Sequence, residues 1–166
     1  MRWASPGRVR EPFGESLDEA AELIRTFDDE GPVQRGEYSR QPVTDDVVRL
    51  VDFYERATGT TASWSNEHFA ELRTTSATLA IGSTRTVPLF APGSARPADN
   101  HSVILEFLVD DVDSVHKNLT GFVEDFVNGP TTMPWGNRAL LFRDPDGNLV
   151  NFFTPVTPAA IEKFAR

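Results

Sequence analysis

The strongest constraint on the fold is that one order of predicted elements occurs twice along the chain. In the first half, residues 37–43 have the pattern of a short strand. Thr44 is expected to cap a helix that ends at Gly59, because a threonine oxygen accepts backbone N–H groups and glycine tolerates a left-handed helix end. The expected buried face of this helix is Val47, Val48, Val51 and Tyr54. Three strands are then predicted at residues 61–65, 68–74 and 77–82.

The second half repeats this strand–helix–strand–strand–strand order. An apolar strand is predicted at residues 103–109, followed by a helix that begins at Asp110-Asp111-Val112-Asp113 and ends at Gly121. Further strands are predicted at residues 122–127, 138–142 and 149–153. The segment 90–100 between the halves is rich in proline and glycine, which is typical of a linker. The fold class is therefore α+β, with two βαβββ modules at about residues 36–83 and 101–156.

The clearest turn in the chain is Asp144-Pro145-Asp146-Gly147-Asn148. Proline sets the first bend, Gly147 accepts a positive φ, and the Asp and Asn side chains close the turn onto backbone amides. The segments on either side are apolar, so the turn predicts a hairpin between the last two strands.

Two helical extensions are predicted outside the domain at residues 36–156. Residues 1–35 are expected to form an arm and then a helix, with Ser16 as its N-cap. The apolar face of that helix is Ala20, Leu23, Ile24 and Phe27. A last helix is predicted at residues 157–166, with Thr157 as N-cap and Pro158 at the first helical position.

Composition limits the class of partner. The formal net charge is −9, and an acidic surface does not displace counterions from phosphates, which argues against nucleic-acid binding. There is no cysteine, which suits the cytoplasm, and no apolar run approaches the length of a membrane span. The N-terminus lacks the apolar stretch of a secretory signal. We therefore expect a cytoplasmic protein with neither nucleic-acid nor membrane partners.

Three segments of the chain resemble the vicinal oxygen chelate superfamily, which includes glyoxalase I, extradiol dioxygenases and bleomycin-resistance proteins. These are the stretch from Thr44-Asp45-Asp46 to Gly59, the sequence Val109-Asp110-Asp111-Val112, and the stretch from Pro134-Trp135-Gly136-Asn137-Arg138 to Val150. The resemblance implies that the modules form curved mixed sheets around a cleft for a small molecule. It also implies a homodimer, an expectation that rests on analogy of fold.

The resemblance further implies where a metal would bind. Metal-using members carry ligands on the first and fourth strands of each module, and these positions fall on Ser39, residues 77–82, Ile104 and Asn151. A divalent ion needs three or four hard or borderline donors that converge on one point. Glu106 shares a strand face with Ile104, but one carboxylate does not form a metal site. We therefore expect no metal and no other cofactor.

The remaining polar residues give no catalytic signature. His68, His101 and His116 share no ligand spacing with one another or with a carboxylate, and surface roles are the favoured interpretation. Nucleophile and phosphate-binding motifs are absent from the sequence. The acidic pair at 110–111 is explained by a helix N-terminus, and the two aspartates of the 144–148 turn are explained by the turn.

Candidate cavity residues follow from strand alternation and from the resemblance. Ile104 and Glu106 share one strand face, as do Asn151 and Phe153. The candidate ligand-binding residues are Ser39, Trp64, Ile104, Glu106, Trp135, Arg138, Asn151 and Phe153. For Trp135 a binding role and a core role are equally favoured, and for Phe153 the core role is favoured. Glu106 lies in an apolar strand and is costly to bury alone, so it pairs with Arg138 or Arg40 or meets a ligand.

Three functional hypotheses remain open at this stage. The first is a metal-independent protein that binds an aromatic or cationic small molecule, which agrees with the acidic charge. The second is a lyase, isomerase or dioxygenase-like enzyme of the same fold, with Glu106 as a general acid or base whose burial would favour the protonated form. The third is an interaction module whose cleft is filled with side chains.

Overall fold

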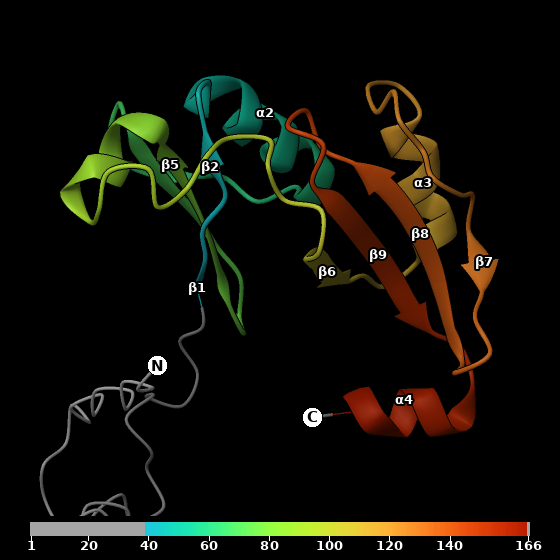
Figure 1. The fold of residues 1–166 in the computed structure, drawn as a ribbon. Coiled ribbons are helices and arrows are strands. Elements are labelled where there is room, and N and C mark those ends of the chain that lie inside the picture. The colour runs from blue at the N-terminus through green and yellow to red at the C-terminus, as the bar shows by residue number, and fades with distance from the viewer. Residues whose placement is uncertain (1–38, 166) are drawn as a thin grey trace, which may run out of the picture. The chain divides into compact units, whose positions relative to one another are not determined.

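The computed structural model describes residues 39–165, which belong to one unit of the chain, Tyr38–Arg166 (Figure 1). The predicted N-terminal arm and helix lie outside the described residues. The described part contains two mixed sheets, each with helices on one face, so the α+β prediction with two βαβββ modules is confirmed. In this part of the chain, no helix combines the length and the hydropathy that a membrane crossing requires.

The first sheet has the strand order β1-β5-β4-β3, and β2 also pairs with β5. Its strands are β1 (Ser39–Arg40), β2 (Val43–Thr44), β3 (Ser63–Asn66), β4 (Phe69–Arg73) and β5 (Thr78–Ser83). The single strand predicted at residues 37–43 is thus divided into β1 and β2. Pro42 lies at the break, and a proline has no N–H to donate to a ladder, although its carbonyl accepts the N–H of Gly82 at 3.1 Å.

The helix of this module, α2 (Val47–Thr58), begins after Asp46 and not after Thr44, as had been predicted. Asp46 is the N-cap, because its carboxylate accepts the N–H of Arg49 at 3.0 Å. Thr44 instead accepts the N–H of Asp46 at 3.1 Å. Gly59 ends the helix with φ of 69°, as predicted.

The predicted buried face of α2 is wrong at one position. Val47, Val51 and Tyr54 are buried, but Val48 is 57% exposed. The residues buried in addition are Leu50, Phe53 and Ala57. A helix advances about 100° per residue, so a face that contains positions 47, 50, 51 and 54 turns position 48 to solvent.

The second sheet has the strand order β6-β9-β8-β7. Its elements are β6 (Ile104–Leu108), α3 (Val112–Leu119), β7 (Thr131–Thr132), β8 (Asn137–Arg143) and β9 (Leu149–Pro155). Asp111 caps α3 and accepts the N–H groups of Asp113 and Ser114. The predicted hairpin is present: β8 and β9 are antiparallel, and Gly147 in their turn has φ of 79°.

The strand predicted at residues 122–127 is not a strand. The segment makes one isolated bridge, Phe126 with Phe142, and the outer strand of the sheet is β7. The side chain of Asn128 accepts the N–H of Leu141 at 2.8 Å, in the place of a ladder carbonyl. Backbone bonds from Val127 N–H to the Leu141 carbonyl and from Arg143 N–H to the Asp125 carbonyl hold the segment at the edge of β8, while Phe122, Val123 and Phe126 pack into the core.

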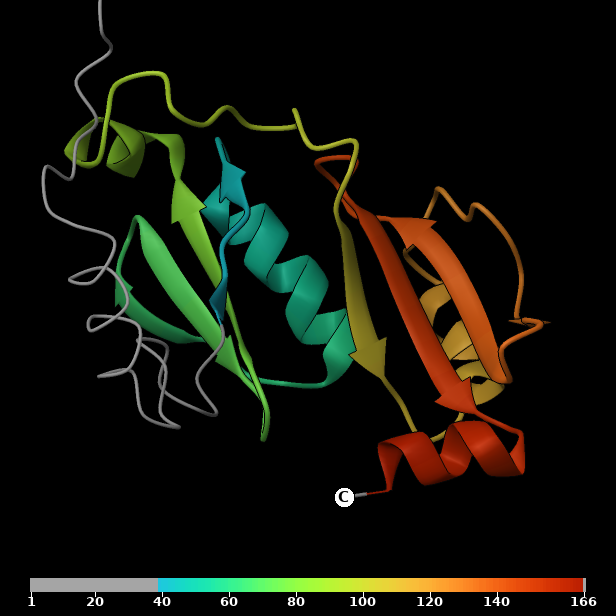
Figure 2. The ribbon, with the colours of Figure 1, turned by 60° about the horizontal axis from the view of Figure 1, so that its bottom comes forward.

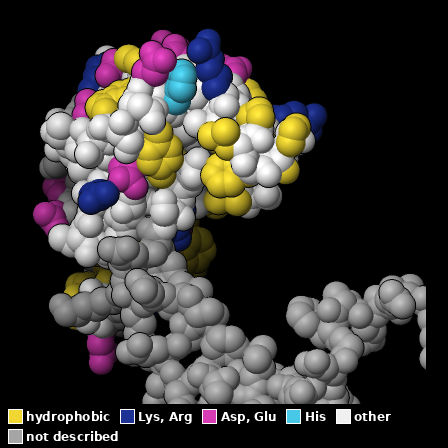
Figure 3. Space-filling view, turned by 90° about the vertical axis from the view of Figure 1, so that its left-hand side faces the viewer, with side chains coloured by type: hydrophobic (Ala, Val, Ile, Leu, Met, Phe, Trp, Pro, Cys, Tyr) yellow, Lys and Arg dark blue, Asp and Glu magenta, His cyan; other side chains and the backbone are white. Residues whose placement is uncertain are grey.

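Two further elements complete the described chain. Before the predicted linker, residues Thr84–Leu89 form the short 3-10 helix η1, which the sequence analysis missed. Leu89 and Phe90 at its end are exposed, and Figure 3 views this side of the protein, where hydrophobic side chains gather in groups. The predicted last helix is α4 (Pro158–Phe164), and Thr157 caps it by accepting the N–H of Ala160.

One hydrophobic core serves both modules. It includes residues of α2, β4 and β5 from the first module and of β6, α3, β8 and β9 from the second. Aromatic rings of α2 contact the second sheet: the Phe53 and Phe142 centroids lie 6.2 Å apart, as do those of Tyr54 and Phe107. Figure 2 shows α2 beside the first sheet and α3 behind β8. Helices α2 and α3 therefore cover one face of each sheet, and on the other face of the second sheet α4 packs only at Phe153, at the end of β9.

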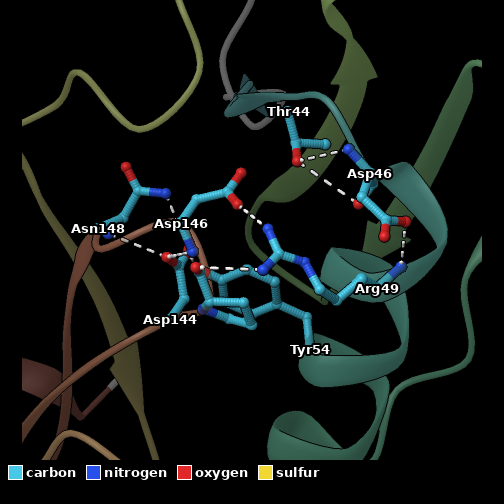
Figure 4. A network of polar contacts seen from close by, with 8 residues as sticks. Thr44, Asp46, Arg49, Tyr54, Asp144, Asp146 and Asn148 are labelled. Atoms are coloured by element: carbon cyan, nitrogen blue, oxygen red, sulfur yellow. Dashed lines mark hydrogen bonds and ion pairs between the residues drawn. The ribbon is translucent and has the colours of Figure 1, made fainter.

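A buried polar contact joins the modules at the 144–148 turn (Figure 4). The Tyr54 hydroxyl donates to Asp144 at 2.8 Å, and Asn148 donates to the same carboxylate through its backbone N–H and its side-chain amide, each at 2.9 Å. Burial raises the pKa of Asp144, and the hydrogen bonds from Asn148 and Tyr54 oppose that rise. Arg49 pairs with Asp146 beside this contact. The turn is thus a junction between α2 and the second sheet.

We predict that Tyr54→Phe destabilises the protein by about 1–3 kcal/mol, because it removes a donor from a buried carboxylate and leaves the volume nearly unchanged. Ser114→Ala is the matched control, since it removes an exposed hydroxyl that bonds to Asp111 at 2.6 Å, and it should change stability by less than about 0.5 kcal/mol. Urea unfolding followed by circular dichroism measures both. Equal stabilities for the two variants would contradict a role of Tyr54 as a junction residue.

A second prediction concerns alkaline pH. Burial raises the pKa of Tyr54 well above its ordinary value of 10.0, and the negative charge of Asp144 adds to the rise. Because the unfolded state loses this proton at a lower pH than the folded state does, the contribution of Tyr54 to stability is constant below about pH 10 and falls as the pH rises beyond it. The difference in phenolate absorbance between the wild type and Tyr54→Phe should appear at the pH at which the protein unfolds. Ionisation of Tyr54 near pH 10 in an intact fold would contradict the buried geometry.

Candidate functional site

The face of the second sheet opposite α3 carries the main candidate residues. Side chains alternate along a strand, so Leu105 of β6 enters the core while Ile104, Glu106 and Leu108 point to the opposite side. Their partners on β9 are Leu149, Asn151 and Phe153. We call Ile104, Glu106, Leu108, Leu149 and Asn151 the open face. Ile104 is 44% exposed and Leu108 is 55% exposed, which is unusual for neighbouring apolar residues of one strand.

Glu106 and Asn151 form a pair at the centre of the open face. They are direct neighbours in the parallel register of β6 and β9, and the Asn151 Nδ2 donates to Glu106 Oε1 at 2.8 Å. Glu106 is exposed, and in the described chain its hydrogen-bond partner is Asn151 and not an arginine. The other side-chain atom of Asn151, Oδ1, is buried and has no hydrogen-bond partner. The pair therefore includes one buried acceptor, Asn151 Oδ1, that receives no hydrogen bond within the described residues.

Arg138 is not the partner of Glu106. Its guanidinium binds Asp113 of α3 through two hydrogen bonds, from Nε at 2.5 Å and from Nη2 at 2.7 Å. This hydrogen bonding holds the pKa of Asp113 below its ordinary value and raises that of Arg138. The pairing places Arg138 on the side of the sheet that α3 covers, away from the open face.

Arg40, the other expected partner, lies close to Glu106 without an ion pair. Both residues line a cavity of about 230 Å³ between the two modules. Residues 74–78, Leu105–Leu108 and the end of α2 form the rest of its wall. A second cavity of about 390 Å³ shares Arg40 and Leu105 with the first. In residues 39–165 no ion pair links Arg40 to Glu106.

The cavity wall is rich in hydroxyl groups that the sequence analysis did not single out. They belong to Thr58, Thr60, Thr74, Thr75, Ser76 and Thr78. The available signal was the run Thr74-Thr75-Ser76 between two strands, which identifies a turn. Nothing in the run shows that the turn faces β6, because that contact depends on how the two modules pack.

Four other candidate residues lie apart from the Glu106–Asn151 pair. Phe153 is buried against Phe164 of α4, with ring centroids 5.2 Å apart, which agrees with a core role. Trp64 pairs with Ala70, whose side chain lies in the core on the α2 side. Ser39 is exposed and pairs with Thr78 at the edge of the cavity. The fourth, Trp135, is 68% exposed on the turn between β7 and β8.

The turn that carries Trp135 is held in a fixed conformation by Gly136. This glycine has φ of 93°, its N–H donates to the Met133 carbonyl at 2.9 Å, and its carbonyl accepts the N–H groups of Val156 and Thr157. A Cβ at position 136 would clash with the Thr157 hydroxyl, which caps α4. Gly136 therefore links the Trp135 turn to the start of α4.

The donors present do not fit a divalent metal. Among residues 39–165, no three side chains of the His, Cys, Asp and Glu types converge on one point. On the open face, Glu106 supplies a carboxylate and its neighbours Ile104 and Leu108 supply no donor. The three histidines lie elsewhere: His68 is beside Glu67, His101 is exposed, and His116 packs edge-on against Phe126. This donor set is short of the three or four ligands that a divalent site needs.

We predict that Gly136→Ala destabilises the protein by more than about 1 kcal/mol, because alanine is strained at positive φ and its Cβ meets the cap of α4. Gly129→Ala is the control, since no atom lies within 4 Å of a Cβ at that position and its φ is not positive. Thermal unfolding of the two variants measures the difference. An equally small effect of both substitutions would show that the turn is not tied to α4.

Comparisons with known proteins agree with this geometry. Residues 42–152 match the model of the Glyoxalase/Bleomycin resistance protein/Dioxygenase superfamily, and no curated protein matches the chain. A glyoxalase/bleomycin resistance protein/dioxygenase from Nocardioides is 20% identical, with a TM-score of 0.65 over 85% of this chain and 95% of its own. A family enzyme from Burkholderia phytofirmans PsJN is 18% identical, with a TM-score of 0.63 over 71% of this chain and 97% of its own.

TioX from Micromonospora sp. ML1 is 24% identical, with a TM-score of 0.57 over 72% of this chain and 98% of its own. Identities this low show a common fold and nothing finer. The family model covers more than half of the chain, however, and it includes both modules, α2, α3 and the 144–148 turn. The chain therefore belongs to the Glyoxalase/Bleomycin resistance protein/Dioxygenase superfamily.

Proposed function

We propose that the protein is a metal-independent small-molecule-binding protein of the glyoxalase and bleomycin-resistance type, which acts in the cytoplasm as a homodimer. The observation that carries this proposal is the open face: two half-exposed apolar residues, Ile104 and Leu108, flank the Glu106–Asn151 pair beside a cavity of about 230 Å³. Ligand sites combine apolar surface with a few polar groups in this way.

The exposed apolar side chains of the open face also support the proposed homodimer. Apolar side chains exposed together on one sheet face are normally covered by a ligand or a partner. The cavities between the modules also count against the hypothesis of an interaction module with a filled cleft. Independence from metal is supported by the side chains of Ser39, Ile104 and Asn151, which stand where the family resemblance implies metal ligands and do not make a divalent site.

An acid–base enzyme is the second candidate, and the Glu106–Asn151 hydrogen bond favours it. Asn151 orients a carboxylate that solvent and ligands can reach, which is the geometry that a general base needs. Turnover with a pH–rate profile that Glu106→Gln abolishes would establish the enzyme. A pure binding protein shows no turnover at any pH.

The test of the proposed function begins with native mass spectrometry after exposure to Ni, Zn, Mn and Fe(II) salts. We expect a mass of two chains and no divalent ion retained in stoichiometric amount. One ion held tightly per chain would contradict the metal-independent proposal, and a monomer at all concentrations would contradict the dimer.

The second part of this test is a thermal-shift screen of aromatic and cationic compounds. A ligand at 100 times its Kd stabilises the folded state by about 2.7 kcal/mol, so true ligands raise the Tm. Leu108→Ser on the open face should remove most of the shift, whereas Val48→Ser on the exposed side of α2 should preserve it. A shift that survives Leu108→Ser would place the ligand elsewhere.

A further inference from the structure

The Asn128-Gly129 sequence places two groups next to each other that can react together. The backbone nitrogen of a residue can attack the side-chain carbonyl carbon of an asparagine that precedes it, and a glycine leaves that nitrogen unobstructed because it has no Cβ. Of the seven asparagines in the chain, only Asn128 precedes a glycine. The other six precede larger residues, which are Glu67, His101, Leu119, Arg138, Leu149 and Phe152.

The structure leaves both reacting groups accessible. Gly129 is exposed, and no atom lies within 4 Å of the position that a Cβ would occupy there. In the described part of the chain, neither the Gly129 N–H nor the Asn128 Nδ2 donates a hydrogen bond. The attacking nitrogen and the departing amide nitrogen are therefore both unrestrained. Asn128 is half-buried, so water also reaches the side chain.

The side-chain oxygen of Asn128, by contrast, is held by β8. The Leu141 N–H donates to Asn128 Oδ1 at 2.8 Å, and the Leu141 carbonyl accepts the Asn128 N–H at 3.2 Å. Negative charge develops on Oδ1 when a nitrogen attacks the carbon that carries it. A backbone N–H aimed at this oxygen stabilises the developing charge, so the bond from β8 favours the attack.

We propose that Asn128 is a site of spontaneous modification, at which the folded protein converts asparagine into aspartate and isoaspartate. The Gly129 nitrogen forms a bond to Asn128 Cγ and loses its proton, while the Cγ–Nδ2 bond breaks and Nδ2 leaves as ammonia. Water then opens the five-membered ring at either of its carbonyl carbons. The reaction consumes one water and releases one ammonia, and it requires no oxidant, reductant or ligand. It is independent of the proposed binding function.

A second pair, Asp146-Gly147, has the same local pattern, because an aspartate reacts through the same ring. The fold separates the two pairs. The Gly147 N–H, which belongs to the attacking nitrogen, donates to the Asp144 carbonyl at 2.9 Å. The Asp146 side chain is 6% exposed and its carboxylate pairs with Arg49. Asp146 is therefore expected to stay unmodified while Asn128 reacts.

The two products at Asn128 have different effects on the edge of β8. Aspartate keeps an oxygen that accepts the Leu141 N–H, and it leaves the main chain unchanged. In isoaspartate the main chain runs through Cβ and Cγ, so it is one atom longer between the nitrogen of residue 128 and β7, which begins at Thr131. The bonds to Leu141 and the pairing of β7 with β8 cannot then both keep their geometry. Isoaspartate therefore loosens this edge.

The reaction is measured on the full chain by incubation at mildly alkaline pH and peptide mapping with mass spectrometry. Methylation by an isoaspartyl methyltransferase labels isoaspartate at either pair. We expect Asn128 to react at least about tenfold faster than any other asparagine, because the attack is unobstructed there. Gly129→Ala is the matched variant: its Cβ meets no atom, so the Tm should stay the same while the rate at Asn128 falls about tenfold.

Three results would overturn this assignment. Asn128 could react no faster than the other asparagines, or its rate could be unchanged in Gly129→Ala at an unchanged Tm. Reaction of Asp146 as fast as that of Asn128 would show that local sequence selects the site and that the fold does not.

The effect on β8 is measured by amide hydrogen exchange of chains separated by ion exchange, since each reacted chain carries an added negative charge. We expect the Leu141 N–H to exchange at least about tenfold faster in isoaspartate chains than in unreacted chains. Asn128→Asp has the same charge with an unaltered main chain, and it should stay within about twofold of the unreacted protein. Equal exchange in the isoaspartate chains and in Asn128→Asp would contradict the loosening of the edge.

Discussion

The geometry of the protein depends on one buried hydrogen bond between a tyrosine and a carboxylate. Tyr54 of α2 donates to Asp144, which at the same time accepts the backbone and side-chain N–H groups of Asn148 that close the β8–β9 turn. A carboxylate placed in a nonpolar environment is costly unless donors surround it, so this arrangement fixes both partners. Because α2 belongs to the first module and the turn to the second, this bond and the shared core together hold one module against the other. The cavity has one wall at Arg40 in the first module and another at β6 in the second, so its shape depends on how the two modules pack.

The shared core explains why the functional surface lies where it does. Helices α2 and α3 cover the core side of the sheets, so alternation along β6 sends Leu105 inward and Glu106 outward. An acid within the run Val103-Ile104-Leu105-Glu106-Phe107-Leu108 is therefore compatible with stability, because it does not enter the core. The unusual feature of β6 is its outward apolar residues, Ile104 and Leu108, which the chain leaves partly exposed.

Short-range sequence patterns predicted most helices, strands and turns. They did not predict which residues pair across the fold. The 144–148 turn and the caps Thr157 and Gly59 depend on a few neighbouring residues, and the structure confirms them. The strand predicted at residues 122–127 was wrong because Phe122 and Val123 donate their N–H groups to Leu119 at the end of α3, and regular pairing with β8 is then limited to one bridge at Phe126. The partner of Glu106 was also missed. Asn151 is 45 residues away and becomes a neighbour only through the parallel register of β6 and β9, whereas Arg138 is drawn to α3 by Asp113. Such choices depend on how sheets and helices pack, which local patterns do not contain.

The number of charged donors on the open face can be compared with the number that a divalent metal ion needs. A divalent ion requires three or four hard or borderline donors, and the positions that the family resemblance implies for them are Ser39, residues 77–82, Ile104 and Asn151. One carboxylate remains, two residues along the strand from Ile104, with an amide beside it. A single carboxylate with an amide beside it is short of the three or four donors that a divalent ion needs. The chain thus keeps the strand geometry of the family while its open face presents a single carboxylate.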